Sequence, residues 1–134
     1  MMPKYLLDTN VCIVYIKFPN SNVRTKIAAT PPAKIAVCSV VKYEMFYGSM
    51  KSSDPVRSLQ IQEGFLSQFE SLPFDDTACR HAAKIRADLS RSGNLIGAYD
   101  ILIAATAVAH DLTLVTHNVS EFSRVIGLRI EDWE

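Results

Sequence analysis

The stretch YLLDTN at residues 5–10 decides the fold of this chain. Its three leading apolar residues have the length of a short buried strand, and the polar residues from Asp8 onward end that strand. The apolar segment 11–16 then predicts a helix that ends before Pro19. A strand and a helix thus follow one another directly, with an acid between them.

Further short apolar runs alternate with helical segments along the rest of the chain. We expect strands over residues 35–38, 72–74, 112–115 and 128–130. We expect helices over residues 21–29, 39–48, 55–71, 76–93, 100–110 and 118–124, with Gly48 and Gly93 as C-terminal stops. The alternation predicts an α/β fold, a three-layer α/β/α sandwich with a short parallel sheet, in a single domain over residues 1–134.

The composition is typical of a soluble globular protein, with 49% hydrophobic and 21% charged residues. Its 14 basic and 14 acidic residues balance, which argues against a generally cationic nucleic-acid coat and leaves room for a local basic groove. Three cysteines without metal-like spacing point to a reducing compartment. With no secretory signal and no apolar run of membrane-spanning length, we expect a cytoplasmic protein without a membrane partner.

Four acids are candidates for one end of the predicted sheet, because ligands of open α/β sheets bind outside the carboxyl ends of the strands. They are Asp8 after the first strand, Glu44 in the helix after the second, Asp100 at the start of a buried helix, and Glu121 after the strand at 112–115. Each also has an ordinary structural explanation. Asp8 and Asp100 suit helix caps, Asn118 and Glu121 have the spacing of a capping box, and Glu44 suits a surface position beside an apolar stripe.

Convergence of these acids would have a physical consequence. Carboxylates within a few ångströms raise one another's pKa, and a divalent cation removes that cost. Oxygen-only ligands favour hard ions such as Mg²⁺ or Mn²⁺ over zinc, and Mg²⁺ prefers phosphate oxygens as further ligands. Such a site would attract a nucleic acid, lower the pKa of a bound water and stabilise charge on a phosphodiester.

The segments YLLDTN, SVVKYEMFYG, IGAYDILIAATA and LVTHNVSEF resemble, in this order, the PIN-domain nucleases and in particular the VapC toxins of bacterial toxin–antitoxin pairs. The resemblance extends from about Lys4 to Trp133. It implies a PIN fold and an endoribonuclease that uses Mg²⁺, with Mn²⁺ as a substitute. A metal-activated water would attack an RNA phosphodiester and leave a 5′-phosphate and a 3′-hydroxyl, and initiator transfer RNA is the target of some relatives.

The resemblance also assigns roles to individual positions. It places the catalytic and metal-binding acids at Asp8, Glu44, Asp100 and Glu121. It places groups that orient carboxylates or water at Thr9, Asn10, Thr116 and Asn118. Many relatives carry aspartate at the position of Glu121, and relatives often have proline at the position of Ala98. The implied partners are a VapB-like antitoxin, an RNA substrate, a second copy of the chain, and promoter DNA only through the antitoxin.

RNA binding at zero net charge requires local cations, and several lie near the expected groove. The candidates are Lys42, Lys51, Arg80, Lys84, Arg86 and Arg91, each equally well explained as part of a solvated helix face. The aromatic residues Tyr43, Phe46, Tyr47, Phe65 and Phe69 are more typical of a core, although part of the group suits a dimer or antitoxin interface. Cys12, Cys38 and Cys79 are expected to be small buried hydrophobic residues.

Two other functions stay open on the residues alone. A catalytically silent module could hold RNA or a protein on the same fold, with the acids serving as helix caps. A phosphoacceptor receiver domain would need a lysine at a later strand end, and no expected strand ends in lysine. The spacing of His81, His110 and His117 gives no support to a ribonuclease mechanism with paired histidines.

Overall fold

A parallel sheet of five strands forms the central layer of the computed structural model, which describes residues 2–134. The elements in chain order are β1 (Tyr5–Leu7), α1 (Thr9–Lys17), α2 (Asn22–Ala29), a 3-10 turn (Pro32–Lys34), β2 (Ile35–Cys38), α3 (Ser39–Met50), α4 (Pro55–Leu66), β3 (Glu70–Leu72), α5 (Asp76–Arg91), α6 (Ala98–Ala109), β4 (Thr113–Val115), α7 (Val119–Phe122) and β5 (Arg129–Glu131). The predicted alternation of strands and helices is confirmed.

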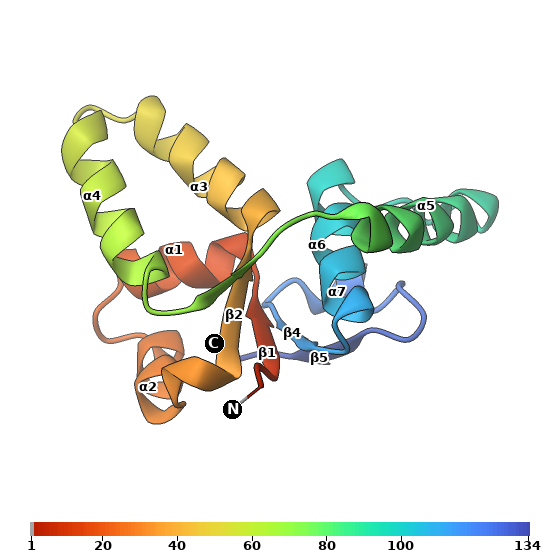
Figure 1. The fold of residues 1–134 in the computed structure, drawn as a ribbon, viewed down its shortest axis with the longest axis horizontal. Coiled ribbons are helices and arrows are strands. Elements are labelled where there is room, and N and C mark those ends of the chain that lie inside the picture. Colours follow the sequence, from red (N-terminus) through yellow and green to blue (C-terminus); the bar gives the residue numbers. More distant parts are fainter. Residues whose placement is uncertain (1) are drawn as a thin grey trace.

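The order of the strands creates a switch point in the middle of the sheet. The strands lie in the order β3-β2-β1-β4-β5, and each pair of neighbours is parallel. The chain adds β2 and β3 on one side of β1, then crosses back to add β4 and β5 on the other side (Figure 1). In open α/β sheets the ligand crevice lies outside the carboxyl ends of the strands at this reversal, which here are the ends of β1 and β4.

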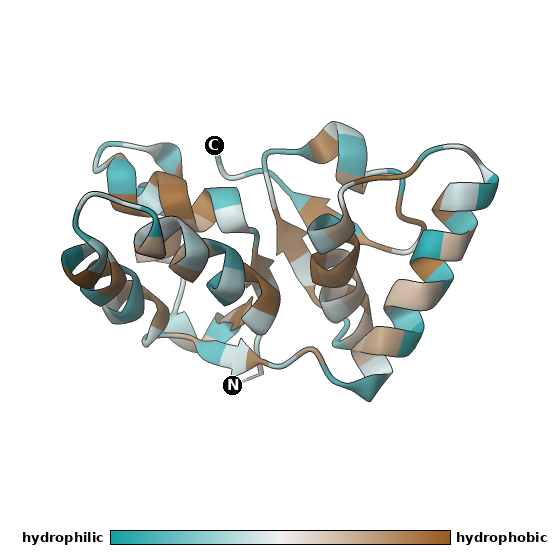
Figure 2. Ribbon diagram, turned by 90° about the horizontal axis from the view of Figure 1, so that it is seen from above, coloured by the Kyte–Doolittle hydropathy of each residue, from teal (hydrophilic) through white to brown (hydrophobic). Residues whose placement is uncertain are grey.

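Helices cover the sheet from two sides. Figure 1 shows α1 to α4 on one side of the sheet and α5 to α7 on the other, which confirms the three-layer α/β/α architecture. Strand β2 is buried along its whole length, as are Leu6 and Leu7 of β1 and all of β4. Burial on both faces explains why these strands read as continuous apolar runs. Figure 2 shows the same pattern, with hydrophobic residues on the strands and hydrophilic residues on the outer turns.

The predicted helix over 55–71 was too long, and the predicted strand over 72–74 began too late. Helix α4 ends at Leu66, where the side chains of Ser67 and Gln68 donate hydrogen bonds to carbonyls of the last turn. Strand β3 then pairs with β2 in the register Ala36 to Glu70 and Cys38 to Leu72. It ends before Pro73, because proline has no N–H to donate to a strand ladder.

Two expectations about helix ends were also wrong. Gly48 does not stop α3, which continues to Met50. In this last turn the hydroxyl of the buried Ser49 shares a 2.8 Å hydrogen bond with the hydroxyl of Ser58 on α4. Helix α6 begins at Ala98 rather than at Asp100, with Gly97 as its N-cap. Ala98 therefore occupies the first helical position, where proline also fits well.

The three cysteines have different environments. Cys12 and Cys38 are buried, as expected, and burial raises the pKa of the Cys38 thiol to about 11. Cys79 lies on an exposed face of α5, which corrects the expectation that all three are buried. Within residues 2–134, every helix falls short of the length and apolar character that a bilayer crossing requires.

Candidate active site

Asp8 lies at the switch point of the sheet. It follows β1 directly and caps α1, and its side chain is only 5% exposed. Its Oδ1 accepts a 2.8 Å hydrogen bond from the backbone N–H of Thr9, and its Oδ2 accepts a 2.8 Å hydrogen bond from the hydroxyl of Thr116, which follows β4. Burial raises the pKa of Asp8, and the charge of Glu44 adds to the rise, although both hydrogen bonds oppose it. The structure thus holds a buried carboxylate in one orientation.

Glu44 points from α3 toward the same place. Its Oε1 accepts a 2.7 Å hydrogen bond from the hydroxyl of Thr9, and its side chain is half-buried. Thr9 therefore binds both acids, Asp8 through its backbone N–H and Glu44 through its side chain. This contact favours an inward orientation of Glu44 over its alternative explanation as a surface residue beside an apolar stripe.

Glu121 is held by Asn118, at the N-terminus of α7. The Asn118 side-chain amide donates a 3.1 Å hydrogen bond to Oε2 of Glu121, and the Asn118 backbone N–H donates to the hydroxyl of Thr116 at 3.0 Å. The expected capping box does not form. The Asn118 side chain does not bind the helix backbone, and its backbone N–H donates to Thr116 instead of to Glu121. Its ψ angle of 59° is far from the extended conformation that directs a capping side chain onto the first turn.

A continuous chain of hydrogen bonds therefore joins three of the four predicted acids. It passes from Glu44 through Thr9 to Asp8, and from Asp8 through Thr116 and Asn118 to Glu121. These bonds connect segments that follow β1, β2 and β4. Three of the four residues expected to orient the acids take part. Asn10 does not, because its side chain is exposed and forms no hydrogen bond within residues 2–134.

Asp100 lies in the first turn of α6, close enough to the other three acids for their charges to act on it. Its pKa is raised from 3.8 to about 6, first by burial and then by the charges of Asp8, Glu121 and Glu44. It does not cap α6, because Gly97 occupies that position. A Cβ atom on Gly97 would lie 3.1 Å from Oδ2 of Asp100, so the glycine leaves space for this carboxylate.

The negative charge of these four acids is not balanced by protein cations. Throughout the described part of the chain, no lysine or arginine forms an ion pair with any of them. Lys84 and Arg91, two of the candidate cations for RNA, instead pair with Asp88 on the exposed face of α5. A set of oxygen donors with unbalanced charge fits a hard divalent cation such as Mg²⁺ or Mn²⁺.

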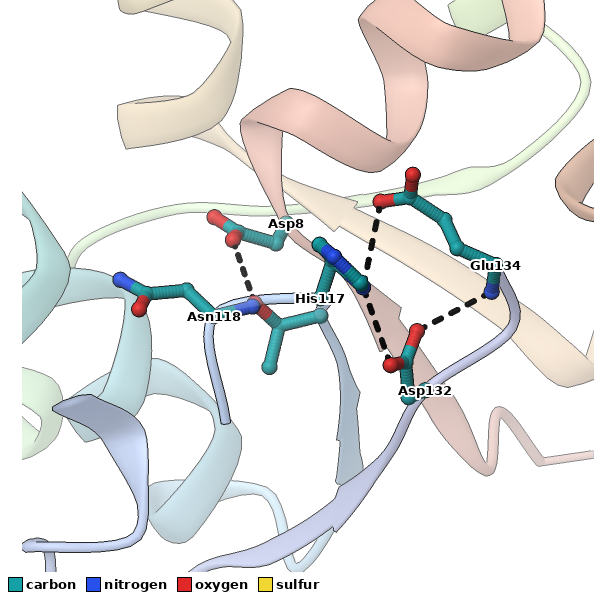
Figure 3. Close-up of polar contacts among 6 residues, drawn as sticks. Asp8, His117, Asn118, Asp132 and Glu134 are labelled. Atoms are coloured by element: carbon teal, nitrogen blue, oxygen red, sulfur yellow. Dashed lines mark hydrogen bonds and ion pairs between the residues drawn. The ribbon is translucent and has the colours of Figure 1, made fainter. Parts of the chain in front are cut away.

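The tightest group of potential metal ligands lies beside this site rather than in it. His117, Asp132 and Glu134 offer atoms within 4.8 Å of one another, and no other three His, Cys, Asp or Glu side chains of residues 2–134 come so close (Figure 3). All three are exposed, and Nδ1 of His117 lies 3.0 Å from Oδ2 of Asp132. No three of the four acids come as close as this among the described residues, and Asp8 and Glu44 each accept a hydrogen bond from a threonine hydroxyl.

Comparison with known proteins identifies the family. The PIN domain family model matches residues 5–128. The tRNA(fMet)-specific endonuclease VapC of Salmonella typhimurium is 41% identical over 132 residues, which cover 98% of this chain and 99% of that protein. The chain belongs to the VapC family of PIN-domain ribonucleases. The fold and the family that the sequence predicted are therefore confirmed, and the chain is an endoribonuclease that acts on phosphodiester bonds.

Two further comparisons extend this likeness. Ribonuclease VapC2 of Haemophilus influenzae is 40% identical over 132 residues, which cover 98% of this chain and 99% of that protein. The crystal structure of DNA-bound VapBC from Salmonella typhimurium superposes with a TM-score of 0.94 at 41% identity, and covers 99% of this chain and 100% of that chain.

Sequence reasoning missed two features of this VapC site. No sequence pattern singled out Gly97, because its closeness to Asp100 depends on where α6 begins. Tyr43 and Tyr99 were not recognised as a pair, although each directly precedes an acid in the sequence. Their hydroxyls lie 3.4 Å apart and join α3 to α6 at the rim of the site.

Proposed function

We propose that this chain is the toxin of a toxin–antitoxin pair and cuts RNA with the aid of a divalent cation. The four acids Asp8, Glu44, Asp100 and Glu121 are the proposed catalytic and metal-binding residues. One observation carries this assignment, namely the chain of hydrogen bonds that joins three of them at the switch point. The charges of these three acids contribute to the raised pKa of the fourth, Asp100. If each acid served only as the cap of its own helix, hydrogen bonds between the acids of different helices would not be expected.

Mg²⁺ is the proposed cofactor, with Mn²⁺ as a substitute, because the four side chains offer only carboxylate oxygens. When bound, the ion supplies a water of lowered pKa and a positive charge beside the scissile phosphodiester. The protein side chains keep the carboxylates in place for it. Thr116 holds Asp8, Thr9 holds Glu44, and Asn118 holds Glu121.

The relatives support a substrate and a set of partners. The VapC of Salmonella typhimurium is named as specific for tRNA(fMet), and the solved VapBC complex from that organism is bound to DNA. For this chain we propose transfer RNA as substrate, a VapB-like antitoxin as partner, and a homodimer that meets promoter DNA only through the antitoxin. We also propose that residues 1–134 form a single PIN domain. The proposed RNA substrate and the free cysteines favour a cytoplasmic location.

Cleavage of purified transfer RNA by the pure protein tests this proposal. Initiator transfer RNA should be cut in Mg²⁺ and left intact in EDTA, and the new ends should be a 5′-phosphate and a 3′-hydroxyl. Asp8→Asn should abolish cleavage, whereas Glu63→Gln, which changes an exposed acid on α4, should not. Cleavage that persists in EDTA or in Asp8→Asn would contradict the assignment. RNA binding without cleavage or metal binding would support the silent module instead.

A further inference from the structure

Two exposed tyrosines stand at the rim of the acidic site. Tyr43 on α3 is 55% exposed and Tyr99 on α6 is 45% exposed. Their ring centroids are 5.5 Å apart, and the Tyr99 hydroxyl donates a 3.4 Å hydrogen bond to that of Tyr43. Tyr43 directly precedes Glu44, and Tyr99 directly precedes Asp100. An RNA strand that reaches the acids from this side meets these rings first.

The exposed aromatic surface continues along α3, away from the acids. Tyr47 lies one helical turn beyond Tyr43 and is 59% exposed, and the ammonium of Lys51 lies 4.7 Å from its ring centroid. Lys42, Tyr43, Tyr47 and Met50 line a shallow groove on this face. Exposed aromatic rings with a lysine at either end thus extend from the acids to the C-terminus of α3.

We propose that this surface, which we call the tyrosine platform (Tyr43, Tyr99 and Tyr47, with Lys42 and Lys51), binds an unpaired segment of the RNA beside the scissile phosphate. The inference rests on the proposed ribonuclease function and names the form of RNA that the site takes. Single-stranded bases stack on aromatic side chains whatever their identity, while nearby cations track the backbone. Bases inside a regular helix are already stacked on one another and cannot use these rings in the same way.

Charge and position favour RNA over a protein as the occupant. Lys42 and Lys51 are not paired with an acid in residues 2–134, so their charges are available to phosphates. The platform is continuous with the acids through neighbouring residues on α3 and α6. A chain of zero net charge needs local cations to bind RNA, and Lys51 lies directly beside an aromatic face of this surface.

The test compares two double variants in an Asp8→Asn background, so that the RNA stays intact. In Tyr43→Leu/Tyr99→Leu the rings are lost, and in Tyr43→Phe/Tyr99→Phe they are kept. Phe18→Leu is the matched control, because Phe18 is 57% exposed but lies at the far end of α1. The probe is a short unstructured oligoribonucleotide with one central 2-aminopurine, whose fluorescence falls when it stacks. The same oligonucleotide in a full duplex is the second probe.

The expected result is a loss of single-strand affinity of roughly ten-fold or more in the leucine double variant, together with loss of the quenching. The phenylalanine double variant and Phe18→Leu should keep both, and duplex affinity should change little. Unchanged single-strand affinity in the leucine double variant would overturn the platform. If the leucine double variant showed a lower molecular mass by light scattering and an unchanged RNA affinity, the tyrosines would instead form a contact between two copies of the chain, and the platform would be overturned. Cleavage of transfer RNA by the unmodified protein is measured in parallel, so a failed platform and a failed ribonuclease give different results.

Discussion

The hydroxyl of Thr116 donates a 2.8 Å hydrogen bond to Oδ2 of Asp8, although 108 positions separate the two residues in the chain. The parallel pairing of β1 with β4 brings them together, because each residue follows directly after one of these strands. The same hydroxyl accepts a hydrogen bond from the backbone of Asn118. Thr116 therefore connects the Asp8 side of the site to the Glu121 side.

Thr116→Val removes this hydroxyl while keeping the shape of the side chain. We expect the free energy of unfolding to fall by about 1–3 kcal/mol, because a buried hydrogen bond to a carboxyl group is lost. The pKa of Asp8 should rise further, since the hydroxyl lowers it, so the acidic limb of the pH–rate profile should move to higher pH. Chemical denaturation and a pH–rate series measure both effects. Thr116→Ser should retain both properties, and a Thr116→Val protein with the original pH profile would contradict this role.

Asp100→Asn should stabilise the metal-free protein at neutral pH. The folded-state pKa of about 6 lies above the ordinary value of 3.8, so ionised Asp100 costs stability above pH 6, and the cost disappears as the pH falls toward 4. Because Asp100 is only half-buried, we expect a gain of roughly 1–2 kcal/mol in the free energy of unfolding at pH 7.5.

Thermal denaturation at pH 7.5 and at pH 4 in EDTA measures this effect of Asp100→Asn. Added Mg²⁺ should stabilise the unmodified protein more than the variant, because the cation neutralises the same charge. A gain in stability that is equal at both pH values would show that the charge of Asp100 is not its cause.

Thr9→Val should weaken metal binding without removing an acid. The Thr9 hydroxyl fixes Glu44 by a 2.7 Å hydrogen bond, and loss of such an orienting group commonly lowers metal affinity or activity by about 10- to 100-fold. Thr9→Ser keeps the hydroxyl and is the matched control. Titration calorimetry with Mn²⁺ compares the two variants, and equal affinities would argue against an orienting role for Thr9.

Gly97→Ala should reduce RNA cleavage through Asp100. The new Cβ would lie 3.1 Å from Oδ2 of Asp100, so the carboxylate must move by a few tenths of an ångström. The flexible Asp100 side chain can move at little cost, so we expect activity to fall, with only the small loss of thermal stability that replacing an N-cap glycine by alanine brings. Gly64→Ala on α4 is the control. Apart from its two chain neighbours and the backbone of its own helix, no atom of the described residues lies within 4 Å of its new Cβ. This variant should keep full activity and gain about 0.5–1 kcal/mol of stability.

Local sequence patterns predicted most elements but not where some of them end. The apolar runs of β1 and β2 identify buried strands, because both faces of this sheet are covered. The boundary between α4 and β3 depends on the register with β2 and on Pro73, and the sequence around residue 67 still continues a helical pattern. Helix α3 continues past Gly48, and the contact between Ser49 and Ser58 in its last turn exists only in the folded chain.

The sequence likewise predicted some features of the candidate site and not others. The positions of the four acids at strand ends and helix starts were readable from the sequence, and their catalytic roles stay predictions. The inward orientation of Glu44 depends on Thr9, which lies 35 positions away. The aromatic residues were expected mainly in the core, and Phe65 and Phe69 are buried there, whereas Tyr43 and Tyr47 are exposed. Residue type alone does not reveal which side of α3 faces solvent.

The central claim is that Asp8, Glu44, Asp100 and Glu121 share a divalent cation, and Mn²⁺ can be located directly. A crystal grown with Mn²⁺ and measured near the manganese absorption edge gives an anomalous difference map. The account predicts a peak within coordination distance of Asp8 and Asp100, and its loss in Asp8→Asn. A peak only at His117, Asp132 and Glu134, or no peak in crystals that contain Mn²⁺ at saturating concentration, would contradict it.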